Sequence, residues 1–135
     1  MSREQAEGRW VLVLGASSGF GEACARAFAE AGYPIFGVHL DRRSGLAKVG
    51  KLKDELEETG VDAHFFNMNA ADPEKMESAL DEMESRMEPG QEVGVLMHSL
   101  AFGTLRPFVG EDAVRPAQMD MTLRVMAHSL VDWTK

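Results

Sequence analysis

The residues best placed to do chemistry are three glycines in a seven-residue stretch, residues 15–21, with the sequence Gly-Ala-Ser-Ser-Gly-Phe-Gly. The apolar run before them, residues 11–14, is typical of a short buried strand. Apolar residues at helical spacing follow and predict one helix face: Phe20, Cys24, Ala27, Phe28 and Ala31. A strand, a glycine turn and a helix N-terminus together form a phosphate site, because free backbone N–H groups and the helix dipole attract an anion that glycines let approach. This context predicts a dinucleotide site.

The predicted phosphate cradle contains both backbone and hydroxyl donors. Its members are Gly15, Ser17, Ser18, Gly19, Phe20 and Gly21. Two simpler interpretations remain open: the glycines serve only the conformation of a strand-to-helix turn, and the serines cap the helix.

The composition excludes several classes of partner. A net charge of −8 disfavours nucleic acid and anionic membranes, since both attract basic surfaces. Cys24 is the sole cysteine and the histidines are widely spaced, so we expect neither a disulfide nor a metal site. The chain has no apolar run of about 20 residues, and its N-terminus, residues 1–9, lacks the apolar segment of a signal peptide. We therefore expect a cytoplasmic protein that has neither nucleic acid nor a membrane as its partner.

Strand and helix patterns alternate along the whole chain, which predicts an α/β fold. Strands are expected at residues 11–14, 35–40, 61–68 and 93–98, and helices after Gly19, over 46–59, from Asp72-Pro73 to before Pro89, and from 117 to the end. Such alternation predicts a doubly wound parallel sheet with strand order 3-2-1-4 and the ligand at the carboxyl ends of the strands.

The interior is expected to take the larger apolar residues of these elements. We expect inner positions at Leu46, Val49, Leu52, Leu56, Ala63, Phe65, Phe66, Met76, Leu80, Met83 and Met87, with Cys24 buried as a small apolar residue.

The end of the second strand bears on the choice between NAD and NADP. An acidic residue there accepts a hydrogen bond from the ribose 2′-hydroxyl, whereas arginine pairs with a 2′-phosphate. Counting from Gly15, the position that is usually acidic is occupied by His39, and Asp41 lies two residues further on. Arg42 and Arg43 follow Asp41 directly. The two arginines favour NADP as the coenzyme, with NAD as the alternative. The simplest other interpretation is that these charged residues form a solvated loop and contact no coenzyme.

Residues 15–21 resemble the coenzyme motif of the short-chain dehydrogenase/reductase family. Asn69 to Asp72 resembles that family's segment after strand 3, whose polar residue contacts the adenine, although Asn69 and Asp72 also suit capping. His98-Ser99-Leu100-Ala101 stands where most members have Asn-Asn-Ala-Gly, and it is more similar to the enoyl-acyl-carrier-protein reductase branch. The glycine spacing, however, is that of the ordinary reductases.

The resemblance implies a Rossmann-type fold and hydride transfer between a nicotinamide and a carbonyl or enoyl group. It places Ser99, Leu100 and Ala101 beside the ribose and nicotinamide, while His98 is equally suited to a structural role. The loop after strand 4 is expected to line the substrate pocket with Phe102, Thr104, Leu105 and Phe108.

Two departures from the family concern catalysis. Met126 stands where many members have an active-site asparagine, and the only tyrosine, Tyr33, is followed four residues later by Gly37, so no Tyr-x-x-x-Lys pair exists. We therefore assign no catalytic residue, and expect residues 1–135 to be an incomplete dinucleotide-binding domain, truncated after the fifth helix and inactive alone. A longer chain or a partner polypeptide would supply the catalytic half.

Two other functions remain open: a non-catalytic dinucleotide-binding module, and an interaction protein that has lost the ligand. We also expect the isolated chain to self-associate or to be marginally stable, because strand 4 leaves an open sheet edge and the final helix is rich in apolar residues. These are Leu123, Val125, Met126, Leu130, Val131 and Trp133.

Overall fold

The computed structural model describes residues 6–135, which form two compact units, one reaching to Ser99 and one from Leu100 to Lys135. The expectation about the polar N-terminus therefore falls partly outside the described residues. Among the helices that the structure describes, none is both long and apolar enough to cross a membrane.

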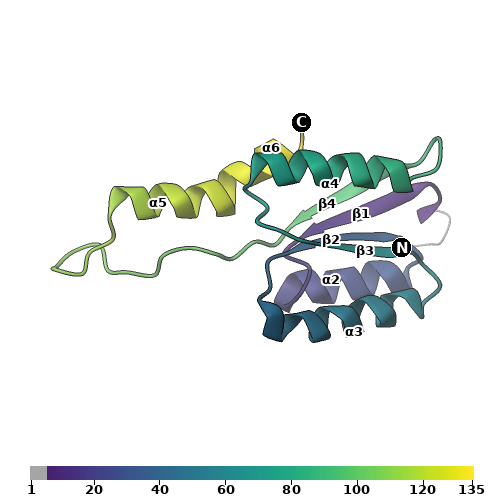
Figure 1. Ribbon diagram of the computed structural model, residues 1–135, viewed down its shortest axis with the longest axis horizontal. Coiled ribbons are helices and arrows are strands. Elements are labelled where there is room, and N and C mark those ends of the chain that lie inside the picture. Colours follow the sequence, from purple (N-terminus) through teal and green to yellow (C-terminus); the bar gives the residue numbers. More distant parts are fainter. Residues whose placement is uncertain (1–5) are drawn as a thin grey trace. The chain divides into compact units, whose positions relative to one another are not determined.

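The first unit is a four-stranded parallel sheet covered on both faces, as the alternation predicts (Figure 1). Its strands are β1 (Arg9–Leu14), β2 (Ile35–His39), β3 (Ala63–Asn67) and β4 (Glu92–His98), and their order is β3-β2-β1-β4. Helices α2 (Gly19–Glu30) and α3 (Leu46–Glu57) cover one face, and α4 (Pro73–Arg86) covers the other. The predicted fold class and strand order are confirmed.

The face beneath α2 and α3 is packed with small and branched side chains. Its buried cluster includes Val11, Val13, Ala25, Ala29, Ile35, Leu52, Leu56 and Ala63. The predicted inner face of α2 is wrong in part, because its buried residues are Gly21, Ala25 and Ala29. Phe20 is 82% exposed, Ala27 is exposed and Cys24 is half-buried. At Gly21 the helix lies so close to the preceding turn that a Cβ would be 1.9 Å from the Gly15 carbonyl oxygen, and Ala25 and Ala29 follow it on the same face.

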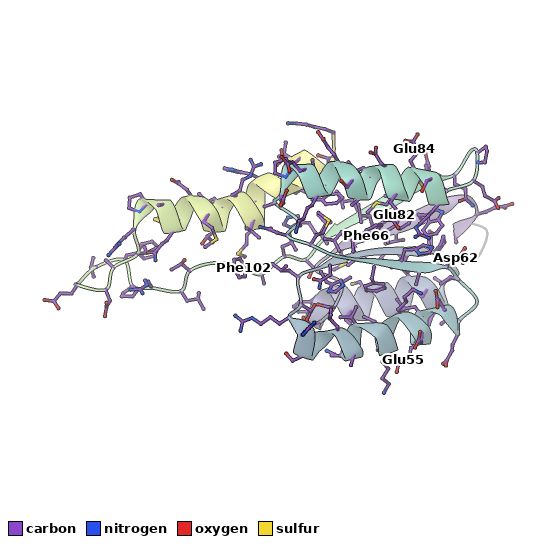
Figure 2. The ribbon with its side chains drawn as sticks, viewed as in Figure 1. Glu55, Asp62, Phe66, Glu82, Glu84 and Phe102 are labelled. Carbon is purple, nitrogen blue, oxygen red and sulfur yellow. The ribbon has the colours of Figure 1, made fainter. Side chains whose placement is uncertain are left out.

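The opposite face carries a group of stacked aromatic residues. The indole of Trp10 stacks on Phe36, with ring centroids 4.1 Å apart, and Phe66 follows at 6.3 Å from Phe36 (Figure 2). Met83 of α4 is buried as predicted, whereas Leu80 is 40% exposed. The same correction applies to Leu46 at the start of α3, which is 41% exposed.

The helix ends follow the expected local signals. The side chain of Asp72 accepts a hydrogen bond from the Lys75 N–H at 3.2 Å, and Pro73 occupies the first position of α4. Helix α3 ends at Glu57, two residues before the predicted end, because the N–H of Gly60 bonds to the Glu57 carbonyl with Gly60 at a φ of 91°.

The second unit contains a loop followed by helical turns. Residues 100–115 form no helix or strand, and then come α5 (Pro116–Leu123), a π-helical turn over Arg124–His128, and α6 (Ser129–Trp133). The predicted single helix from residue 117 is thus interrupted. The Thr104 N–H bonds to the Thr122 hydroxyl at 3.1 Å, which ties the loop to α5.

Candidate functional site

The glycine loop between β1 and α2 needs its three glycines for two reasons. Gly15 and Gly19 have φ angles of 90° and 56°, which L side chains rarely adopt. Gly21 has no such angle, but a Cβ on it would lie 1.9 Å from the Gly15 carbonyl oxygen. The loop therefore folds back on the first turn of α2, and no other residue type fits at Gly21.

The loop is fixed to the sheet by β2. The N–H groups of Gly15 and Ala16 both donate to the Val38 carbonyl, at 2.8 and 3.0 Å. Gly37 makes room for this contact, because a Cβ there would lie 3.0 Å from the Ala16 Cβ and 2.7 Å from the Phe65 ring. The loop conformation is thus set before any ligand arrives.

The N-terminus of α2 is open to solvent. Ser18 occupies the N-cap position without a capping bond from its side chain, so the predicted capping role for Ser18 is not realised. Ser18, Gly19 and Phe20 are exposed, and nothing lies within 4 Å of a Cβ built on Gly19. The first N–H groups of the helix are therefore accessible to an anion.

Glu22 brings a negative charge to this helix end, and basic residues neutralise it. Its carboxylate contacts the guanidinium of Arg26 at 3.0 Å and the ammonium of Lys48 at 3.1 Å. Burial acts to raise the pKa of Glu22, but hydrogen bonds from Arg26 and Lys48 outweigh it and hold the pKa below its ordinary value. Arg26 also bonds to Glu55 of α3 at 2.6 Å (Figure 2), so the two helices are joined by this network.

The end of β2 holds a pair of polar side chains, His39 and Asp41. His39 is buried, and its Nδ1 lies 2.9 Å from Oδ2 of Asp41. The nearby Ser17 hydroxyl, followed by His39, holds the pKa of Asp41 below its ordinary value, although burial acts to raise it. The Asp41 carboxylate is therefore a charged partner of His39 at the end of β2.

The sequence analysis did not assign a role to Asn67. Its position as a polar residue at the carboxyl end of β3 is a signal that could have identified it. Its side-chain oxygen accepts from the Asp41 N–H at 3.0 Å, and its amide group donates to the Asp41 carbonyl at 3.0 Å. These two bonds fix the backbone of Asp41 to the end of β3.

The remaining predicted coenzyme-binding residues differ in their exposure and hydrogen bonds. Arg42 and Arg43 are exposed, and no carboxylate of residues 6–135 lies within 4 Å of either guanidinium. The Asn69 side chain accepts from the Ala71 N–H at 3.0 Å, which gives it a turn-forming role. Ser99 donates from its N–H to the Leu14 carbonyl at 2.8 Å.

The first unit thus gathers most of the predicted residues at one edge. The glycine loop, Asp41, Asn69 and Ser99 follow the carboxyl ends of β1, β2, β3 and β4 respectively. Parallel strands place these ends together, and the order reverses between β1 and β4, where ligands bind in such sheets. Leu100 and Ala101 belong to the second unit. Among the residues described, no group of three His, Cys, Asp or Glu side chains could hold a metal ion.

Comparisons with known proteins agree with this architecture. Residues 9–135 match the family model described as short chain dehydrogenase. Sulfoacetaldehyde reductase 2 of Chromohalobacter salexigens is 36% identical over 73 residues, which are 54% of this chain and 27% of that protein.

Two solved structures share the fold. L-Sorbose reductase from Gluconobacter frateurii, complexed with NADPH and L-sorbose, aligns with a TM-score of 0.78 at 20% identity over 94% of this chain and 45% of its own. A blue fluorescent protein from a metagenomic library, in complex with NADPH, has a TM-score of 0.78 at 24% identity over 93% of this chain and 48% of its own. The chain therefore spans less than half the length of these relatives.

Proposed function

Because the chain belongs to the short-chain dehydrogenase/reductase family, we propose that it supplies the coenzyme-binding part of an NAD(P)(H)-dependent oxidoreductase. The glycine loop is the observation that carries this proposal. Its glycines close the turn, and the exposed N-terminus of α2 beyond them is free to receive the pyrophosphate. Gly15, Ser17, Ser18, Gly19, Phe20 and Gly21 would hold this group.

We propose NADP as the coenzyme in preference to NAD. The exposed guanidinium groups of Arg42 and Arg43 stand beside the end of β2, where a 2′-phosphate would lie, and Arg pairs with phosphate through two parallel hydrogen bonds. NADPH is also the coenzyme in both solved relatives described above. Asn69 would lie at the adenine, and Ser99, Leu100 and Ala101 at the ribose and nicotinamide.

The bound coenzyme would supply the hydride for reduction of a carbonyl or enoyl group on a small-molecule substrate. The similarity of His98-Ser99-Leu100-Ala101 to the enoyl reductase branch keeps the second option open, while the partial relative named above is an aldehyde reductase. The 135 residues contain no Tyr-x-x-x-Lys pair, so we propose that the general acid comes from polypeptide outside them. A homo-oligomeric, cytoplasmic protein fits this role.

A non-catalytic dinucleotide-binding module is the second candidate. The missing Tyr-x-x-x-Lys pair favours it, and it requires the same coenzyme site. The two proposed functions differ in one measurable respect. If this chain is part of an oxidoreductase, it should catalyse reduction once a longer chain or a partner polypeptide supplies the catalytic residues, whereas a binding module should not.

Coenzyme titration with a matched pair of glycine variants tests the site. Gly19 and Gly60 both have positive φ angles, 56° and 91°, and open space around a Cβ, so valine strains the backbone similarly at each. Gly60 lies before β3 at the amino end of the sheet, away from the proposed site. We expect Gly19→Val to abolish the change in NADPH fluorescence on binding, and Gly60→Val to retain it.

Retained NADPH binding in Gly19→Val together with lost binding in Gly60→Val would contradict the placement of the coenzyme site. Equal loss in both variants, with the fold intact by circular dichroism, would mean that backbone strain and not position determines binding. No binding of NADPH or NADH by the wild-type chain would reject the proposed function itself.

A further inference from the structure

We propose that Asn67 is a positioning residue that fixes the loop after β2, so that Arg42 and Arg43 are held where they can pair with the 2′-phosphate of NADP. This inference rests on the proposed function and on NADP as its coenzyme. It gives Asn67 no contact with the coenzyme, and it predicts an effect on NADP that NAD does not share.

The side chain of Asn67 continues the hydrogen bonding between β2 and β3 beyond the last paired residues. In the sheet His39 pairs with Asn67, and the Met68 N–H donates to the His39 carbonyl at 2.7 Å. At Asp41 the Asn67 side chain supplies the next acceptor and donor. Its Oδ1 accepts from the Asp41 N–H, and its Nδ2 donates to the Asp41 carbonyl, each at 3.0 Å. A side-chain amide suits this place because it carries both a donor and an acceptor.

Asp41 is in turn the residue against which the arginine-bearing turn packs. Its carboxylate lies 2.9 Å from Nδ1 of His39, whose side chain is 3% exposed, so its side chain is fixed as well as its backbone. The turn closes where the Gly45 N–H donates to the Arg42 carbonyl at 2.8 Å. A Cβ on Gly45 would lie 2.8 Å from Oδ1 of Asp41, so the turn and the carboxylate are in close contact. The turn therefore starts from a residue that is bonded to both β2 and β3.

The two guanidinium groups depend on this backbone for their position. Arg42 follows Asp41 directly, Arg43 begins the turn, and both residues are exposed. Two parallel hydrogen bonds to a phosphate require a defined approach of the guanidinium plane. A shift of the turn would therefore weaken the pairing even though both arginines are still present.

A structural role and a positioning role for Asn67 predict different affinity patterns. The two hydrogen bonds of Asn67 are exposed, so water replaces them when they are lost and the fold remains. NADP and NAD differ only in the 2′-phosphate. A general disturbance of the site would weaken both coenzymes, whereas displacement of the arginines weakens NADP alone.

The test is titration of the purified chain and its variants with NADPH and NADH. Asn67→Leu removes both hydrogen bonds with little change in side-chain size. We expect it to raise the dissociation constant for NADPH about tenfold and to leave that for NADH within about twofold of the wild-type value. Equal weakening of the two coenzymes, or an unchanged affinity for NADPH, would overturn the proposal. Asn67→Ser, whose side chain is too short to make both bonds, should behave in the same way and replaces Asn67→Leu if that variant does not fold.

A double replacement, Arg42→Ala with Arg43→Ala, shows whether Asn67 acts through the arginines. We expect it to weaken NADPH more than Asn67→Leu does and to leave NADH unchanged. Asn67→Leu added to it should cause no further loss, because no guanidinium remains to be positioned. Additive losses of NADPH affinity would contradict the proposal.

Thr59→Val is the matched control. It removes a hydroxyl that bonds to the carbonyls of Leu56 and Ala29, at 2.7 and 3.3 Å, and so joins the end of α3 to α2. We expect both affinities to stay unchanged in this variant. A selective loss of NADPH binding equal to that in Asn67→Leu would show that the effect does not depend on the loop after β2.

The same titrations separate the possible failures. No binding of either coenzyme by the wild-type chain would reject the proposed function. Unchanged NADPH affinity in the double arginine variant would reject the phosphate site at Arg42 and Arg43, and the role of Asn67 with it. A loss in the arginine variant without a loss in Asn67→Leu would reject the positioning role alone.

Discussion

The first unit and the loop of the second unit use apolar residues in different ways. In the first unit most of them lie inside, where Trp10 stacks on Phe36 and the branched residues of β1 and β2 are buried. In the loop of the second unit, Leu105 is 100% exposed and Phe108 is 80% exposed. The first unit owes its order to a sheet that buries both faces, whereas the second is tied locally by the hydroxyl of Thr122. An apolar residue is therefore informative about stability only where a sheet or helix covers it.

The largest expected effect is a difference in unfolding free energy between a substitution in the first unit and one in the loop of the second unit. Phe36→Ala should lower the free energy of unfolding of the first unit by about 3–5 kcal/mol, because it opens a cavity beneath Trp10. Leu105→Ala should change it by less than about 0.5 kcal/mol, because that side chain has no cover to lose. Urea denaturation measures both values. Similar losses in the two variants would show that residues 100–115 contribute to the same core.

A smaller effect tests whether local hydrogen bonds hold the second unit. Thr122→Val keeps the side-chain shape but removes the hydroxyl that accepts from the Thr104 N–H. We expect protection of the Thr104 amide against hydrogen exchange to fall by about 1 kcal/mol, with no change at the amides of β1. If the Thr104 amide exchanges at the same rate in both proteins, packing and not this bond orders the loop.

The smallest effect concerns pH. The described groups with a shifted pKa, Glu22, Arg26, Asp41, Glu55 and His64, all belong to the first unit. Burial and the nearby charge of Arg86 lower the pKa of His64 below 6.5, so the fold favours its neutral form.

The sign of the effect follows from that shift. The contribution of His64 to stability is complete above pH 6.5 and is lost as the pH falls below it, because the unfolded chain then binds more protons. His64→Gln should therefore flatten the decline in unfolding free energy between pH 6.5 and 5. An unchanged slope would assign the decline to other groups.

The sequence predicted the sheet because strong local signals agree with one another. Glycines at the ends of β1 and α3, the Asp72-Pro73 start of α4 and the apolar strands each indicate the same alternation, and the parallel order follows from the crossovers. The interrupted final helix was missed, since no proline or glycine marks the π-helical turn at Arg124–His128.

Helix faces were harder to predict for a physical reason. Hydrophobic periodicity assigns the inner face to the largest apolar side chains, and in α2 this selected Phe20. The close approach of Gly21 to Gly15 instead turns the small residues Ala25 and Ala29 inward and leaves Phe20 in solvent. The contact between Gly21 and Gly15 forms only when the loop is folded, so it cannot be predicted from the periodicity of apolar residues.

The site was predicted in its positions but not in its connections. The glycine loop and the end of strand 2 were both identified, yet the hydrogen bonds from the N–H groups of Gly15 and Ala16 to the Val38 carbonyl arise only when β1 and β2 pair. Asn67 escaped notice for the same reason, because its partner is the backbone of Asp41 on the neighbouring strand.

The stacking of Trp10 has a practical consequence for spectroscopy. The sequence holds two tryptophans, Trp10 in the first unit and Trp133 in the second, and each is buried in the structure. A Trp133→Phe variant would emit from Trp10 alone, and a Trp10→Phe variant from Trp133 alone. Intrinsic fluorescence thus offers a separate optical channel for each unit, without the attachment of any dye.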